Sequence, residues 1–136
     1  MKITSYYFLV LDIETSTLFN DEKEPTAVWL SYGFCNLYDY KGNRLNKCYF
    51  RDWITLQKFF ILCQQKFVDK KIICFVHNLG YEFDFLIKNI SRPNNILSNS
   101  SHAVISSCLN LFPQIEFRCT FRLSMLPLKE IGRLVN

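Results

Sequence analysis

The sequence is poor in residues that interrupt regular structure, with four glycines and four prolines among 136 residues. It has no apolar run near the roughly 18 residues that span a bilayer. It has no CxxC pair either, because its six cysteines lie at least ten residues apart. These absences argue against a collagen-like or disordered chain, a membrane partner and a zinc knuckle. The first apolar stretch stops at Asp12 without a small-residue cleavage site, so we expect no signal peptide and a cytoplasmic protein.

The composition is that of a globular domain with a core. Hydrophobic residues make up 49% of the chain and charged residues 21%, which is close to an ordinary soluble protein, while aromatic residues reach 16%. The length suits a single domain. The net charge of +4 is compatible with a polyanionic partner without requiring one. Cys63 and Cys74 lie inside apolar runs, which predicts small buried hydrophobes and reduced thiols.

The apolar patterns predict alternating strands and helices. Tyr6 to Leu11 is a continuous apolar run, typical of a strand buried on both faces. Strands are also expected at residues 27–38, 45–50, 72–76, 96–97, 104–109 and 115–121, and helices at residues 53–68 (with Asp52 as its N-cap), from the loop 77–80 to Ile90, and in the tail 126–135. Pro93 lies just beyond the second helix and is expected to stop it. The order predicts an α/β fold, a mixed sheet of the RNase H-like kind with flanking helices.

Two groups of acidic residues could carry chemistry. Asp12 and Glu14 are two residues apart after the first apolar run, so their side chains share one face of a strand. Converging carboxylates suit a hard cation such as Mg²⁺, although a strand emerging into solvent is the commoner reason for such a pair. Glu82 and Asp84 follow a second buried strand and lie on opposite flanks of a helical pattern. The spacing leaves either of them open as a third carboxylate.

Three segments carry a resemblance to a known family. Leu11-Asp12-Ile13-Glu14-Thr15 resembles the first motif of the DEDD 3′–5′ exonucleases. About sixty residues later, His77-Asn78-Leu79-Gly80-Tyr81-Glu82-Phe83 resembles the second motif in the form used by protein-primed family B DNA polymerases of phages and linear plasmids. Residues 120–132, which begin Thr-Phe-Arg-Leu-Ser, are similar to the family's segment that lines the single-strand channel. The resemblance covers essentially the whole chain.

The resemblance implies a role for each matching residue. Asp12, Glu14 and Glu82 would be the catalytic ligands of two Mg²⁺ or Mn²⁺ ions, with Asp84 as the alternative to Glu82. The residues expected to hold the 3′ end of a single-stranded primer are Thr15, His77, Asn78, Tyr81, Thr120 and Phe121. The implied partners are that DNA strand, the rest of the polymerase and a terminal protein, in the host cell cytoplasm if a phage encodes the chain. Arg118, Arg122, Lys129 and Arg133 add positive charge that suits a phosphate backbone.

The chain departs from the family pattern in three places. Glu82 stands where relatives carry Asp, and Cys119 where they carry an Asp before the Ser/Thr. The third exonuclease motif, Tyr-x-x-x-Asp, does not occur in residues 1–136, and neither do the polymerase motifs of palm, fingers and thumb. We therefore expect one partial exonuclease domain, incomplete at its C-terminus, that is weakly active or inactive alone. The alternatives are a non-catalytic RNase H-like module that binds single-stranded DNA or a polymerase partner, and a plain α/β interaction domain.

Overall fold

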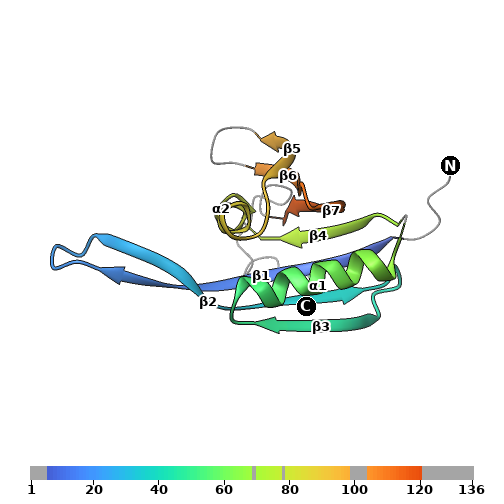
Figure 1. The fold of residues 1–136 in the computed structure, drawn as a ribbon, viewed down its shortest axis with the longest axis horizontal. Helices are drawn as coiled ribbons and strands as arrows, with labels where there is room; N and C mark the ends of the chain where they lie inside the picture. Colours follow the sequence, from blue (N-terminus) through green and yellow to red (C-terminus); the bar gives the residue numbers. More distant parts are fainter. Residues whose placement is uncertain (1–5, 69, 78, 99–103, 121–136) are drawn as a thin grey trace.

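The structure is a computed structural model that describes residues 6–68, 70–77, 79–98 and 104–120. Its elements follow the order predicted from the sequence (Figure 1). They are β1 (Tyr7–Phe19), β2 (Pro25–Tyr38), β3 (Arg44–Phe50), α1 (Trp53–Lys66), β4 (Ile72–Val76), α2 (Leu79–Asn89), β5 (Pro93–Ser98), β6 (Val104–Leu109) and β7 (Phe112–Cys119). The helix expected at residues 126–135 lies outside the described residues.

The strands form one mixed sheet in the order β3-β2-β1-β4-β7-β6-β5. β4 runs parallel to β1 on one side and to β7 on the other, whereas the remaining neighbours are antiparallel. The α/β class and the mixed sheet are therefore confirmed. The three parallel strands at the centre end at the same edge, which is where α2 begins.

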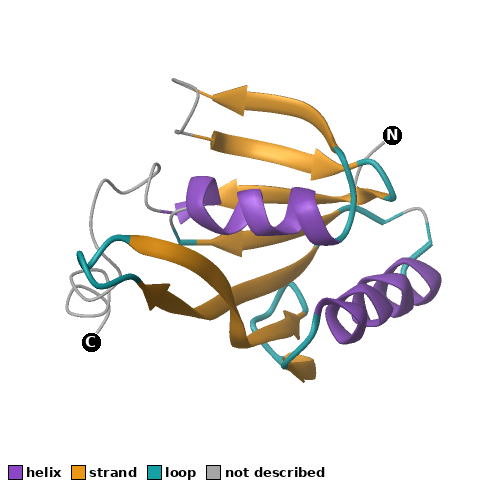
Figure 2. Cartoon of the chain, turned by 60° about the vertical axis from the view of Figure 1, so that its left-hand side comes forward, coloured by secondary structure: helices purple, strands orange, loops and turns teal. Residues whose placement is uncertain are grey.

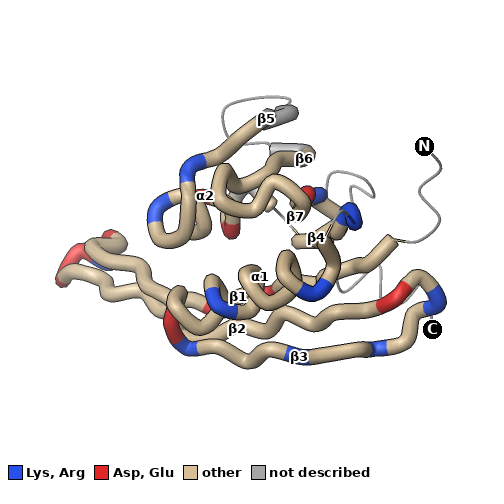
Figure 3. The backbone as a smooth tube through the Cα atoms, turned by 45° about the vertical axis from the view of Figure 1, so that its right-hand side comes forward, with Lys and Arg blue, Asp and Glu red and all other residues tan. Residues whose placement is uncertain are grey.

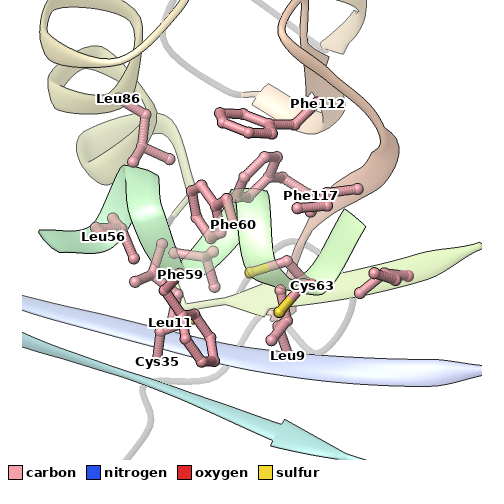
Figure 4. Close-up of a cluster of buried hydrophobic side chains, with 14 of the residues drawn as sticks. Leu9, Leu11, Cys35, Leu56, Phe59, Phe60, Cys63, Leu86, Phe112 and Phe117 are labelled. Carbon is pink, nitrogen blue, oxygen red and sulfur yellow. The ribbon is translucent and has the colours of Figure 1, made fainter. Parts of the chain in front are cut away.

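Both helices pack against one face of the sheet (Figure 2). The core between them and the strands is rich in phenylalanine, and Figure 4 shows side chains of α1, α2, β1 and β7 meeting there. Phe60 lies at its centre, with its ring centroid 5.4 Å from that of Phe112 and 5.9 Å from that of Phe117. Cys63 and Cys74 are buried in the same cluster, as the sequence predicted. Among the described residues, no helix covers the opposite face of the sheet, which we call the open face.

The helix boundaries follow from the sequence. Asp52 is the N-cap of α1, and its carboxylate accepts a hydrogen bond of 2.7 Å from the backbone N–H of Thr55. α2 ends at Asn89, a few residues before Pro93. No helix in the described part of the chain is long and apolar enough to cross a membrane.

Strand β1 differs from its prediction in burial and in length. Leu9, Leu11 and Ile13 are buried, but the residues between them are exposed, so β1 buries one face rather than two. β1 also continues to Phe19, because it pairs with β2 well beyond the apolar run. The paired residues 15–30 project past the rest of the sheet as a two-stranded arm (Figure 1). Acidic residues lie at the tip of this arm (Figure 3).

Candidate functional site

Asp12 and Glu14 lie on β1 just past the point where its parallel partner ends. The last pair between β1 and β4 is Leu11 with Val76. Beyond Val76 the chain leaves the sheet and enters α2, so β1 has no strand on that side. Both carboxylates are exposed, since they alternate with the buried Leu11 and Ile13. They therefore lie at the carboxyl end of the parallel strands, although in the middle of β1 and not at its end as the sequence suggested.

A β-bulge lies next to these carboxylates. The pairing of β1 with β2 shifts between Glu14 and Thr15, so that Ser31 is the extra residue on β2. The hydroxyl of Ser31 hydrogen-bonds to that of Ser16, which gives this irregular point a polar partner. Bulges bend a strand, increase its twist and re-aim its side chains, and they recur beside functional sites. Here the bulge marks the start of the projecting arm.

Glu82 is the buried member of the acidic group. The residue is 6% exposed, and its Oε2 atom has no hydrogen-bond partner among the residues that the structure describes. The pKa of Glu82 is raised to about 8, first by burial and then by the negative charges of Asp12 and Glu14, while a hydrogen bond from its own backbone N–H acts in the opposite direction. A carboxyl in this environment gains from any cation that approaches it. The structure thus brings Glu82 within electrostatic reach of the β1 pair.

Asp84 lies elsewhere. It is exposed on α2 and lines a pocket on the side of the helix that faces the arm. The two acids that the sequence left as alternatives are therefore separated by the helix. The charges of Asp12 and Glu14 act on Glu82, which places its carboxyl near the β1 pair.

Several of the residues expected to bind DNA meet in pairs. The hydroxyl oxygens of Thr15 and Tyr81 hydrogen-bond at 2.7 Å, which connects the arm to α2. The ring Nδ1 of His77 and the hydroxyl of Thr120 hydrogen-bond at 2.9 Å, which connects the ends of β4 and β7. These contacts join residues more than forty positions apart at one edge of the sheet. Asn78 and Phe121 lie outside the described residues.

Cys119 has a structural role at this edge. Its Sγ atom accepts a hydrogen bond of 3.3 Å from the backbone N–H of Leu79, the first residue of α2. The first N–H groups of a helix have no partner within the helix, so the thiol satisfies one of them. The residue that departs from the family pattern thus anchors the start of the helix that carries Glu82.

The sequence did not reveal a pocket of about 630 Å³ between the arm and α2. It is lined by Pro25, Thr26, Ala27, Val28, Tyr81, Asp84, Phe85, Lys88 and Asn89. Tyr81 belongs both to this pocket and to the contact with Thr15, so the pocket reaches the base of the arm. Its floor depends on the extension of β1 and β2 beyond the sheet, and no motif marks that extension.

Part of the positive charge that was expected to suit a phosphate backbone is paired with an acidic side chain. Arg118 forms an ion pair of 2.6 Å with Glu116, which also attracts Lys71 at 3.6 Å. Both cations lie at the sheet surface. Arg122, Lys129 and Arg133 fall outside the described residues.

The candidate ligands for a metal ion are the carboxylates of Asp12, Glu14 and Glu82. Three carboxylates, one of them with an orphaned buried oxygen, have the chemistry that Mg²⁺ and Mn²⁺ prefer. However, no group of three or more His, Cys, Asp or Glu side chains within the described ranges is arranged closely enough to hold a metal. Among the described residues, the carboxylates thus suit a cation by the chemistry of their oxygen atoms but do not form a chelating cluster in this arrangement.

Comparison with known proteins gives no assignment. A scan against protein-family models, a search of curated proteins and a search of solved structures each find no match to this chain.

Proposed function

We propose that this chain is the N-terminal part of a protein-primed DNA-directed DNA polymerase and carries an incomplete, metal-dependent 3′–5′ exonuclease site on an RNase H-like sheet. The observation that carries the proposal is the environment of Glu82. A buried carboxylate beside two further carboxylates destabilises the folded chain unless a proton or a metal cation neutralises it. The residues around it are those that the exonuclease motifs name.

In this proposal the three carboxylates hold Mg²⁺ or Mn²⁺, whose charge assists hydrolysis of the terminal phosphodiester. Thr15 and Tyr81 hold the terminal nucleotides of a single DNA strand, Tyr81 by stacking its half-exposed ring. His77 and Thr120 support the same edge. The rest of the polymerase, with a terminal protein as its primer, would supply the missing Tyr-x-x-x-Asp element and the polymerase motifs.

The open face of the sheet leaves several large apolar side chains exposed. Val10, Phe34 and Tyr49 are each between 45% and 49% exposed on that face. Exposed apolar groups of this size are typical of surfaces that contact something else.

The test is degradation of 3′-labelled single-stranded DNA by the purified chain, with Mg²⁺, Mn²⁺ or EDTA. The matched control replaces Asp12 and Glu14 together by alanine. Metal-dependent loss of the label that disappears in the double variant supports the proposal, even at a low rate. Degradation that survives the double substitution rules out this site.

A non-catalytic module that binds single-stranded DNA or a polymerase partner is the second candidate. It is favoured by the exposed aromatic rings of Phe34 and Tyr49 on the open face, because such rings stack unpaired bases without any metal. Binding of a labelled oligonucleotide without loss of label, in the presence of either metal, would select this candidate.

A further inference from the structure

The open face carries a cluster of three aromatic side chains next to the carboxylates. Tyr32 and Phe34 lie on β2 and alternate with the buried Gly33 and Cys35, so they point away from the helices. Tyr49 lies on β3 between two buried residues and points the same way. The three rings are 39%, 45% and 49% exposed. We call Tyr32, Phe34 and Tyr49 the aromatic platform.

The rings of the platform are in mutual contact. The centroids of Phe34 and Tyr49 are 5.0 Å apart, and Tyr32 lies 6.0 Å from Phe34 and 6.1 Å from Tyr49. Aromatic rings at these distances hold one another in place. The platform therefore offers preorganised π surface to solvent, at low entropic cost to a ligand that stacks on it.

The strand register connects the platform to the carboxylates. Asp12 of β1 is paired with Phe34 of β2, which in turn is paired with Tyr49 of β3. Glu14 is paired with Tyr32 in the same way. Because neighbouring strands lie about 4.8 Å apart, Tyr49 is about 10 Å across the sheet from Asp12. A ligand lying on the rings would thus end at the carboxylates.

Positive charge lies on the far side of the platform from the carboxylates. Arg51 donates a hydrogen bond of 3.0 Å from its Nε to the hydroxyl of Tyr49, and its guanidinium lies 6.0 Å from the centre of that ring. Lys47 is exposed two residues before Tyr49 on the same face of β3. Apolar rings flanked by cations match a chain of unpaired bases joined by phosphates. They are a poor match to a purely apolar helix.

We propose that the aromatic platform stacks unpaired bases of a single DNA strand whose 3′ end reaches Asp12 and Glu14. The proposal rests on the proposed function, because it assigns the path of the same substrate across β3 and β2. Arg51 and Lys47 contact the phosphates, and the rings accept any base, since every base has a π face. The platform acts on internal nucleotides and needs neither a 3′ end nor a metal.

The test uses circular single-stranded oligothymidylate labelled with a fluorophore, mixed with the chain in EDTA and followed by anisotropy. The circle has no 3′ end and EDTA removes metals, so the result is independent of hydrolysis at the carboxylates. Phe34→Leu combined with Tyr49→Leu keeps exposed apolar side chains but removes two rings. We expect the affinity to fall about 100-fold, because two rings are removed and each stacked base contributes about one order of magnitude.

The matched control is Tyr40→Leu, which removes an even more exposed ring in the turn between β2 and β3, outside the platform. Its affinity should equal that of the wild type. Crosslinking of the wild-type chain to a circle containing 5-iodouracil gives a readout that needs no variant. The crosslinked peptides should contain Tyr32, Phe34 or Tyr49.

The proposal is overturned if the wild-type chain does not bind the circle, or if the double variant binds it as tightly as the wild type. A wild-type dimer that the double variant dissociates, with unchanged DNA affinity, would assign the platform to a second copy of the chain instead. Binding of the circle together with stable linear DNA in Mg²⁺ would support the platform and select the non-catalytic module over a chain that is an active exonuclease by itself. Metal-dependent degradation of linear DNA without binding of the circle would support the exonuclease and reject the platform.

Discussion

Replacing Glu82 by Gln is expected to stabilise the folded chain at neutral pH. Burial, Asp12 and Glu14 raise the pKa of Glu82 from its ordinary value of 4.5 to about 8. Between these two values the folded chain binds a proton that the unfolded chain has released. The free energy of unfolding therefore falls as the pH rises from about 4.5 to about 8. Protonated Glu82 makes its full contribution to the stability of the folded chain only below about pH 4.5.

The size of the effect follows from the width of that window. Each pH unit within it costs about 1.4 kcal/mol, so the wild-type chain loses about 3 kcal/mol between pH 4.5 and pH 7. Glutamine has nearly the shape of a protonated glutamate and does not titrate. Glu82→Gln should therefore not lose this stability, and its free energy of unfolding at pH 7 should be about 3 kcal/mol higher than that of the wild type. This difference corresponds to a melting temperature roughly 10 °C higher for a domain of this size.

Thermal unfolding followed by circular dichroism from pH 4.5 to pH 8.5 measures this difference. The two melting temperatures should be similar at the acidic end and separate steadily as the pH rises. Glu22→Gln, at an exposed position in the arm, is the matched control and should follow the wild-type curve. Wild-type and Glu82→Gln curves that stay parallel across the whole range would refute the buried, proton-binding carboxyl.

Three further substitutions test the core, the helix start and the sheet, each by urea unfolding. Phe60→Ala removes a fully buried ring from the centre of the core and should cost about 3 to 5 kcal/mol. Asp52→Ala removes the N-cap of α1 and should cost about 1 kcal/mol, whereas Asp52→Asn should cost less. Gly33→Ala places a methyl group against the ring of Phe50 and should cost about 1 to 3 kcal/mol, with recovery in a double variant that also carries Phe50→Leu. Unchanged midpoints in any of these variants would contradict the packing described above.

The sequence correctly predicted the features that depend only on the side chains of residues close together in the chain. β4 occupies the predicted residues, Ile72–Val76, because an apolar run of this length has no other stable place than a buried strand. Asp52 was identified as an N-cap because its carboxylate can satisfy a free N–H in the first turn of α1. In both cases the neighbours in sequence carry the whole signal.

The extent of β1 could not be predicted in this way. Its second half, from Thr15 to Phe19, is mostly polar and half-exposed, and it is held by backbone hydrogen bonds to β2. Such bonds are available to any residue except proline, so the side chains carry little trace of them. The pocket beside the arm was missed for the same reason.

The choice between Glu82 and Asp84 depended on where α2 begins. The sequence pattern assigned Leu79 to a loop, and the buried stripe was then centred between the two acids. In the structure Leu79 belongs to the helix and is fully buried with Phe83 and Leu86. At about 100° per residue, this shifts the centre of the stripe to about 70° from Glu82 and about 130° from Asp84. The early start of the helix, held by the Sγ atom of Cys119, thus decides which carboxylate is buried.

The burial of Glu82 is costly to the isolated chain, and its position makes this cost hard to avoid. A helix that buries Leu79, Phe83 and Leu86 also covers the residue at position 82, where an apolar or amide side chain would be more stable. The glutamate there lowers the stability of the folded state at neutral pH, and the two carboxylates of β1 lower it further. At neutral pH these effects hold Glu82 in its protonated form beside Asp12 and Glu14, and a bound cation would favour release of that proton and take all three carboxylates as ligands. The energetic cost and the proposed metal-dependent chemistry therefore have a single physical origin.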